Sequence, residues 1–514
     1  MQGSSLSTAY PLGLRRTVVV FSGLMLGMLL AAVSQTIVAT ALPKIVADLG
    51  GLDHYSWVVS AYLLASTVTV PLYGKLSDIY GRRELFALAI CLFMIGSTVC
   101  GLATGMGMLI AGRAVQGLGA GGLIPLAIAA IGDIIAPRER GRWQAVTGAV
   151  FGVASVVGPS LGGWIADTAS WRWAFFVGMP FGLMALAVVA VGFRGAFERR
   201  PHEIDYVGAA LLVTGVTAGL LACVWGGSEL AWTSPAELGL FALSLVTLVA
   251  FVAWERQRAE PIIPVGLFRD RTFAASQAAL FTVGAAMFGA IVYVPLFVQG
   301  ALGRSATSSG AVLTPLMLGL VAASAGAGQI VSRTGRYRAL LAAGPLVMAV
   351  GFGLLAGLGV RSTPGQVTLA LTVTGIGLGL CMQTYVVVVQ NAVPRRLMGA
   401  ATAATQFFRQ IGATIGVTIA GAVVSSRLAD ELAARLGPKA ASVSSTLAAP
   451  RPGGHAEQAL ASALPAREAV ASALHPVFVA GVPLLLVAFV CALFVEHIEL
   501  RRTVGESAAE ASVG

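Results

Sequence analysis

Hydrophobic residues recur along this chain in runs of about twenty, separated by short polar segments that carry most of the charge. A helix rises about 1.5 Å per residue, so roughly twenty apolar residues cross the ~30 Å hydrocarbon core of a membrane. The pattern predicts an all-α polytopic membrane protein with fourteen spans, at 17–42, 57–77, 84–104, 107–133, 143–166, 172–193, 205–226, 236–254, 273–299, 308–331, 338–360, 366–390, 400–426 and 476–496.

Composition supports this prediction. The chain has 514 residues, of which 57% are hydrophobic and 11% are charged. Soluble domains carry about 25% charged residues, so soluble domains of this total size would lack the charge to cover their surfaces. The first run follows two arginines but is too long for the apolar part of a signal peptide, and we expect it to be retained as a span.

Basic residues distinguish the two sides of the predicted membrane. If the N-terminus is inside, arginines collect in the inside segments, whereas the short outside segments hold only Lys44, Arg172, Arg304 and Arg361. Positive charge favours cytoplasmic loops, so the asymmetry predicts a multi-pass protein of the cell membrane with cytoplasmic ends at 1–16 and 497–514. Because the arginines are scattered over short loops, the net charge of +10 is topological and we expect no nucleic-acid partner.

The segment 427–475 differs from the other connections. It is long, rich in Ala, Ser and Pro, and contains the linker-like stretch AAPRPGGH. We expect a long external loop whose first residues fit a short amphipathic helix.

Motifs of soluble enzymes occur only in the wrong context. GLGAGG (117–122) resembles a dinucleotide-binding loop, but no strand precedes it. GPSLG (158–162) resembles the turn around a hydrolase serine, but it lies in an apolar helix with no evident His or Asp partner. The chain has no Walker A sequence, and its five cysteines lie in apolar runs without metal-ligand spacing. We therefore expect a protein that is not an enzyme, with no cofactor, no metal site and no coupling to ATP.

Charge is concentrated in one short turn, PLYGKLSDIYGRREL (71–85). Asp78 and Arg82 are four residues apart, which places them on one face if the turn is helical. Gly74 and Gly81 permit close backbone approach and a sharp reversal. The alternative is a solvated turn that only obeys the positive-inside rule. GKLSDIYGRR resembles the signature loop of the major facilitator superfamily, and the resemblance extends over almost the whole chain.

Two further motifs resemble the fourteen-helix drug/proton antiporter branch of that superfamily. LIAGRAVQGLGAGG (109–122) is similar to the fourth-helix motif and places Arg113 inside a span, with Gln116 one turn later. An arginine in the membrane costs about 2.5–3.5 kcal/mol on insertion scales, so we expect Arg113 to face a cavity and, together with Gln116, to act in proton or substrate coupling. GAVFGVASVVGPSLGG is similar to the fifth-helix antiporter motif, with Gly148, Gly152, Gly158, Pro159, Gly162 and Gly163.

The resemblance implies a fold of two six-helix bundles, 17–195 and 272–496, with two inserted helices at 205–255. It also implies that the charged turn is a latch for alternating access, in which Arg82 faces both Asp78 and Asp133. The predicted latch residues are Gly74, Asp78, Gly81, Arg82, Arg83 and Asp133.

The chain departs from the branch in its first span. The usual acid of that span is replaced by Ser34 in AAVSQTIVATALP, and no Asp or Glu lies deep in any predicted span. This departure weakens the expectation of cationic substrates, because an intramembrane acid is the natural counter-charge for a cation. The polar residues predicted to line a substrate cavity are Ser34, Gln35, Tyr62, Tyr293, Gln383 and Gln390, each of which could instead form an interhelical hydrogen bond.

The resemblance implies efflux of a hydrophobic or amphiphilic small molecule across the lipid bilayer, driven by protons. One alternative is a dedicated exporter of a single natural product, metabolite or lipid, neutral or anionic in view of Ser34. The other is a membrane receptor or scaffold that transports nothing.

Overall fold

The computed structural model describes residues 14–49, 55–135, 170–192, 205–226, 230–258, 261–304, 306–394, 397–437 and 464–496, together with parts of 143–165. The described residues form helices and no β-sheet. Thirteen of the helical segments are long and apolar enough to cross a membrane. The fifth predicted span, 143–166, is described only in helical pieces, so the described part of the chain is consistent with fourteen spans.

The first bundle begins with the long helix α2 and ends with a helix that is broken near its start. Its helices are α2 (Leu14–Leu49), α3 (Tyr55–Tyr80), α4 (Arg82–Gly101), α5 (Met106–Ile134), α7 (Trp173–Phe176) and α8 (Met179–Gly192). The single span predicted at 172–193 is therefore two helical segments, α7 and α8, in the structure.

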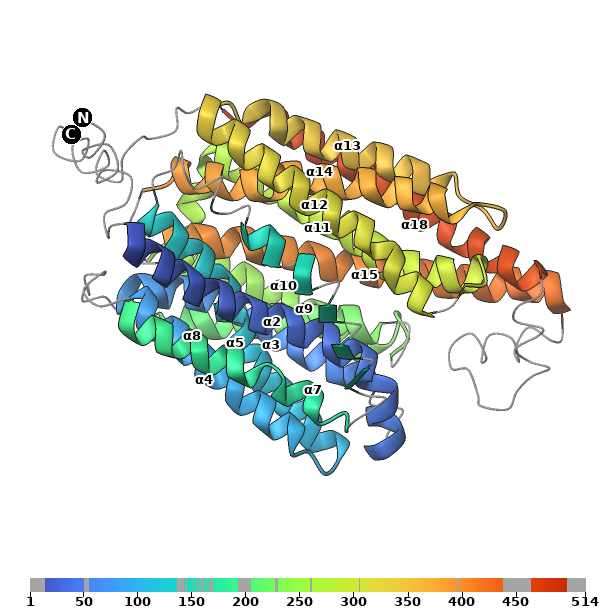
Figure 1. Cartoon of the computed structure of the whole chain (residues 1–514), viewed down its shortest axis with the longest axis horizontal. Coiled ribbons are helices and arrows are strands. Elements are labelled where there is room, and N and C mark those ends of the chain that lie inside the picture. Colours follow the sequence, from blue (N-terminus) through green and yellow to red (C-terminus); the bar gives the residue numbers. More distant parts are fainter. Residues whose placement is uncertain are drawn as a thin grey trace.

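The second bundle follows two helices that lie between the bundles in sequence, α9 (Tyr206–Trp225) and α10 (Pro235–Glu255). Its elements are α11 (Arg271–Leu296), η3 (Phe297–Ala301), α12 (Ala306–Thr334), α13 (Arg338–Ala356), α14 (Pro364–Ala392), α15 (Met398–Leu436) and α18 (Leu464–Leu493). Figure 1 shows the two bundles as separate groups of roughly parallel helices.

The last two helices extend beyond the predicted spans. We predicted an external loop over 427–475, but α15 continues to Leu436 and α18 already begins at Leu464. Arg435 holds the two extensions together, with its guanidinium 2.8 Å from Glu431 Oε2 and 2.7 Å from Glu468 Oε2. The predicted loop is therefore shorter at both ends, and its central part, 438–463, lies outside the described residues.

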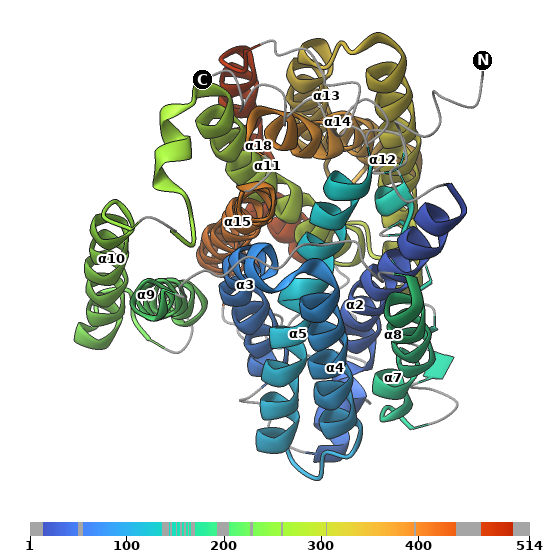
Figure 2. The same ribbon diagram turned by 90° about the vertical axis from the view of Figure 1, so that its left-hand side faces the viewer.

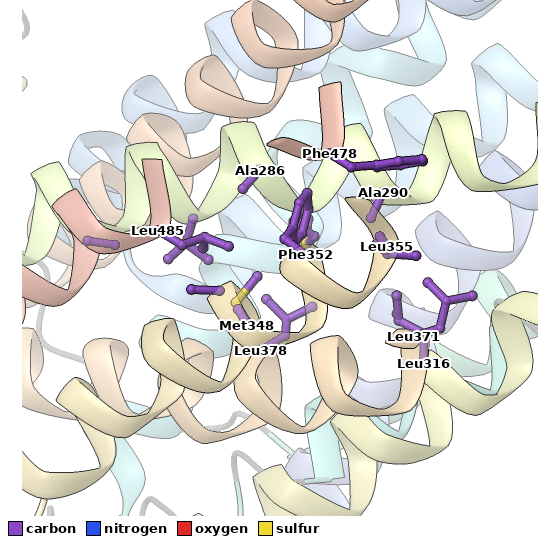
Figure 3. Packing of buried hydrophobic residues seen from close by; sticks show 14 of the residues in the cluster. Ala286, Ala290, Leu316, Met348, Phe352, Leu355, Leu371, Leu378, Phe478 and Leu485 are labelled. Carbon is purple, nitrogen blue, oxygen red and sulfur yellow. The ribbon is translucent and has the colours of Figure 1, made fainter. Parts of the chain in front are cut away.

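Each bundle has its own hydrophobic core. The core of the second bundle includes Met348 and Phe352 of α13, Leu378 of α14 and Phe478 of α18, and Figure 3 shows these side chains packed together. Two clusters in the first bundle contain only residues of that bundle, one around Phe86 and Phe93 and one around Trp171 and Phe175. The bundles can therefore keep their internal packing if they move relative to each other.

The inserted helices lie at the seam between the bundles. Figure 2 shows α9 beside α3 and α15, with α10 on the outer side of α9. Val216 of α9 belongs to one hydrophobic cluster with Val68 of α3 and Phe407 of α15. The indole rings of Trp57 and Trp225 add an edge contact between α3 and α9, with centroids 5.4 Å apart.

Small residues allow α4 and α5 to pack at backbone distance. A Cβ atom on Gly119 would lie 2.5 Å from both the carbonyl oxygen of Ala89 and the backbone nitrogen of Phe93. Close contacts of this kind replace the hydrophobic driving force that helices lack within lipid. Glycine inside these spans is therefore a packing residue.

We expect Gly119→Val to destabilise the purified protein by about 1–3 kcal/mol, because the added side chain must displace the backbone of α4. Gly107→Val is the matched control on the same helix, since a Cβ at Gly107 meets no atom within 4 Å. Thermal unfolding in detergent, followed by size-exclusion chromatography, measures both variants. Equal midpoints for the two variants would contradict the packing role of Gly119.

Candidate functional site

The charged turn between α3 and α4 is held in shape by Gly81. Its φ of 95° lies in the left-handed region, which glycine adopts without strain, and this conformation ends α3 and starts α4 at Arg82. Arg82 is buried, with 4% of its surface exposed. The turn therefore directs a guanidinium into the protein and not into solvent.

Arg82 binds two carboxylates at once. Its Nη2 lies 2.6 Å from Asp78 Oδ1, and its Nε donates to Asp133 Oδ2 at 2.9 Å. The remaining amino group donates to the hydroxyl of Ser77. The structure thus brings together three of the residues predicted for the latch, from α3, α4 and α5.

Asp78 also reaches the second bundle. Its Oδ2 accepts a hydrogen bond of 3.1 Å from the backbone N–H of Ala400, in the first turn of α15. The first turn of a helix has N–H groups without helical partners and carries partial positive charge, so it is a favourable place for a carboxylate. The sequence analysis did not identify Ala400, because its contact uses the backbone N–H, which every residue except proline has.

Close backbone packing surrounds this contact. A Cβ on Gly74 would press against Ala403 and lie 3.1 Å from the carbonyl oxygen of Gly399. A Cβ on Gly399 would in turn collide with the carboxylate of Asp78 and the guanidinium of Arg82. Gly74 and Gly399 therefore let α3 and α15 approach closely enough for the Asp78–Ala400 hydrogen bond.

Arg83 lies apart from the carboxylates. Its Nη2 donates to the carbonyl oxygen of Ala190 in α8 at 2.9 Å. The structure therefore places Arg83 in a contact within the first bundle, whereas Arg82 binds the two acids.

Arg113 is enclosed in the first bundle, with 1% of its surface exposed. Its Nε donates to the carbonyl oxygen of Val58 at 3.0 Å, a second amino group donates to Gln116, and the guanidinium lies 4.1 Å from the centre of the Tyr62 ring. Gln116 Nε2 donates in turn to Ser34 at 3.1 Å and to Ser97 at 2.7 Å.

This polar network joins α2, α3, α4 and α5. The hydrogen-bond donors of the buried arginine are satisfied by neutral groups, and an aromatic ring contacts its guanidinium. The usual partner of a buried arginine would be a carboxylate. Ser34 and Tyr62, both predicted to line a cavity, belong to this network, and Gln35 is exposed on α2.

The fifth predicted helix contacts both bundles. A Cβ on Gly148 would lie 3.5 Å from Leu320 and Ser324 of α12, and one on Gly152 would lie 2.7 Å from Val321 of the same helix. Gly158 instead faces Thr36 of α2. Gly162 is buried, while Pro159 and Gly163 lie outside the described residues.

The remaining predicted cavity residues divide into two groups. Tyr293 donates to the carbonyl oxygen of Val417 at 3.1 Å, and Gln390 Nε2 donates to the carbonyl oxygen of Ile128 at 3.2 Å. These two form interhelical hydrogen bonds, of which the second joins the bundles. Gln383 donates to Thr147 at 3.0 Å and lines a cavity.

That cavity contains an arginine that the sequence analysis missed, Arg409 of α15. The stretch QFFRQIGATIG carries the signal, because it places an arginine and a glutamine inside an apolar run of the thirteenth span. Arg113 is therefore not the only arginine within the membrane-spanning helices that the structure describes.

Comparisons with known proteins agree with this architecture. The sequence model of the Major Facilitator Superfamily matches residues 24–417. The chain is 40% identical over 424 residues to the multidrug transporter protein MdtP of Bacillus subtilis, which covers 82% of this chain and 78% of that protein. It is 38% identical over 410 residues to multidrug resistance protein 3 of the same organism, covering 80% of each chain.

A solved structure shows the same fold at low sequence identity. The proton:xylose symporter XylE aligns with a TM-score of 0.62 at 13% identity, covering 96% of this chain and 98% of that one. Together, the family match, the relatives and the helical architecture show that this chain belongs to the Major Facilitator Superfamily of membrane transporters.

Proposed function

We propose that the protein is a secondary active transporter that exports hydrophobic or amphiphilic small molecules in exchange for protons, by alternating access between its two bundles. The relatives named as multidrug transporters support efflux as the direction and amphiphiles as the substrate class. The single observation that carries the proposal is the hydrogen bond from the backbone N–H of Ala400, in the first turn of α15, to Asp78, which is itself paired with Arg82; this bond joins the bundles at one end.

The end at which the bundles are joined carries the arginine-rich loops, which the positive-inside rule places in the cytoplasm. Asp78, Gly81 and Arg82 lie in the turn after the second span, and Asp133 lies at the end of the fourth. Gln390 and Gln383 add two more hydrogen bonds between the bundles, to Ile128 and Thr147. With this orientation, the described conformation would have closed cytoplasmic ends and a substrate path that opens outward.

Opening the cytoplasmic end requires breaking only a few directional contacts. The Asp78–Ala400 hydrogen bond, the two bonds of Gln390 and Gln383, and the packing of Gly74 against α15 must separate. The Asp78–Arg82–Asp133 group can stay intact within the first bundle. A charge-assisted hydrogen bond contributes about 1.5–3 kcal/mol, which is the scale of a conformational switch. Protons would act at acids near helix ends, with Asp133 as the proposed site, because the first span offers Ser34 and no carboxylate.

Purified protein in liposomes tests the proposed function directly. We expect an uncharged fluorescent amphiphile to accumulate on the side from which protons leave, and accumulation to vanish when an ionophore removes the pH gradient. Movement without dependence on the gradient would contradict proton antiport. Binding of amphiphiles without any movement would favour the receptor alternative, and movement of one compound out of a broad panel would favour the dedicated exporter.

The latch predicts that Asp78→Asn lowers efflux per folded molecule by about tenfold or more while substrate binding stays near native, because the carboxylate that pairs with Arg82 and accepts from Ala400 loses its charge. Dye efflux from cells and dye binding to purified protein measure the two properties. Arg83→Gln is the matched control in the same turn, since Arg83 contacts Ala190 and not the acids. Normal efflux by Asp78→Asn would contradict the latch and would mean that the charges of this turn serve only to orient the protein in the membrane.

A second variant tests closure without removing a charge. We expect Gly399→Val to hold the cytoplasmic ends apart, because its side chain would occupy the space of the Asp78 carboxylate. Spin labels at Tyr80 and Arg336, both exposed at that end, report the distance between the bundles by pulsed electron paramagnetic resonance. Gly326→Val on α12 is the control, since a Cβ there meets no atom within 4 Å. Identical distance distributions in Gly399→Val and the control would exclude the latch.

A further inference from the structure

Two arginines lie inside the described membrane-spanning helices, and their surroundings differ. The acids of the described helices lie in the first or last two turns, so no carboxylate neutralises either arginine in the membrane interior. Arg113 is fully enclosed by a carbonyl, an amide and an aromatic ring. Arg409 is partly accessible and faces a cavity. Only Arg409 is therefore available to a ligand.

Arg409 has spare hydrogen-bonding capacity. Its Nε and Nη2 donate to one acceptor, Gln406 Oε1, at 3.2 and 2.6 Å. Guanidinium has five N–H donors, and no ion pair to Arg409 occurs in the part of the chain that the structure describes. A cation inside the membrane without an anion is costly, so a site that keeps one is suited to an anion from outside the chain.

The depth of Arg409 agrees with a central binding site. It follows Met398, the start of α15 at the latched end, by eleven residues. At about 1.5 Å per residue this is about 16 Å along the helix, which is half of a ~30 Å hydrocarbon core. Arg409 is therefore near the middle of the membrane, where transporters of this architecture hold their substrates.

The rest of the cavity is matched to an amphiphile. Its apolar wall is formed by Leu280 of α11 with Met382 and Val386 of α14. Its polar side adds Gln383 and Thr405 to the arginine. An apolar wall beside a single cation complements an organic molecule that has an apolar body and one negative group.

Gln383 links the cavity to the seam between the bundles. Its Nε2 donates to Thr147 of the fifth predicted helix, and its Oε1 is buried without a hydrogen-bond partner among the described residues. A ligand that reorients this amide would therefore act on a contact between the two bundles.

We propose that Arg409, with Gln406 and Gln383, binds the carboxylate or sulfonate group of an amphiphilic organic anion, which makes such anions preferred substrates of the exporter. This inference rests on the proposed efflux function and specifies its substrate class. Arginine suits the role because its planar fork binds a carboxylate with two parallel hydrogen bonds. A cationic drug would instead meet an unneutralised positive charge, and Ser34, at the position of the usual acid, is bonded to Gln116.

In the described conformation the cavity is small. Its volume is about 20 Å³, enough for about one water molecule and far below the roughly 300–1,000 Å³ of pockets that hold a drug-sized molecule. The ligand must therefore occupy space that is created when the bundles move. Arg409 would bind the anionic group in the same way for each substrate, whereas the apolar contacts would differ from one substrate to another.

A matched pair of probes tests the assignment: a fluorescent amphiphile with one carboxylate, and its uncharged methyl ester. Binding is measured with full-length protein in phosphatidylcholine nanodiscs. We expect Arg409→Gln to weaken carboxylate binding roughly tenfold or more, the effect of losing a charge-assisted bidentate contact, and to change ester binding less than about twofold. Arg409→Lys should recover part of the loss, because the charge returns without the fork.

Two further variants keep the test independent of folding. Arg435→Gln removes an arginine of the same helix outside the cavity and should leave both affinities unchanged. Gln383→Glu places a negative charge on the cavity wall and should weaken only the carboxylate probe. Retained ester binding shows that each variant is folded.

A lipid headgroup is a second source of the same chemistry. If phosphatidylglycerol in the nanodisc displaces the carboxylate probe from native protein, and has no such effect on residual binding to Arg409→Gln, the anion site is supported and a lipid occupies it. If Arg409→Gln weakens both probes equally, or neither, the anion site is wrong. Native protein that transports the ester and rejects the carboxylate would overturn this inference and leave efflux standing, whereas failure to transport either probe would count against efflux itself.

Discussion

The buried Arg82 between two carboxylates is the interaction on which the rest of the structure depends. Burying a charge costs several kcal/mol unless its partners are well placed, and here Asp78 and Asp133 lie within 2.9 Å of one guanidinium. The group fixes the turn after α3 relative to the end of α5. It thereby holds the second oxygen of Asp78 in position for the backbone of Ala400. This hydrogen bond between the bundles therefore depends on a cluster that forms within the first bundle.

The two bundles use intramembrane arginine in opposite ways. In the first bundle, Arg113 with Gln116 and Tyr62 forms a closed network that ties four helices together. In the second bundle, two N–H groups of Arg409 donate to the same amide oxygen, Oε1 of Gln406, and the guanidinium lines a small cavity. A satisfied buried network stiffens its surroundings, whereas unsatisfied donors are available to a ligand. In the proposed transport cycle, the first bundle would therefore be the rigid side and the second bundle the adaptable one.

The fold could be predicted from sequence because lipid permits few solutions. Apolar runs must be helices to satisfy their own backbone, so the runs alone predicted the spans. The extension of α15 agrees with the short amphipathic helix expected from LADELAARL at the start of 427–475, whereas the extension of α18 was missed because it precedes the apolar run, where hydropathy has no signal. The two acids of the latch, Asp78 and Asp133, were predicted from the resemblance to the family's motifs. The Ala400 contact could not be predicted, because any residue offers a backbone N–H.

The polar candidates for the cavity show a second limit. Sequence identifies a glutamine or tyrosine inside a span, but helix rotation decides what it faces, and a shift of one residue turns a side chain by about 100°. Tyr293 and Gln390 bond to neighbouring helices, whereas Gln383 reaches the cavity. Arg409 carried the strongest signal of all, an uncompensated charge in a span.

The inserted helices bear on how the bundles can move. The cluster of Val68, Val216 and Phe407 joins α3, α9 and α15, and α3 and α15 are the helices that carry Asp78 and Ala400. Apolar contacts are not directional, so such a seam can slide with little change in energy as long as contact area is kept. The hydrogen bond of Asp78 is directional and is lost after a small displacement. In the proposed transport cycle, the seam would therefore guide the motion of the bundles, and the latch would determine which of the two end states is populated.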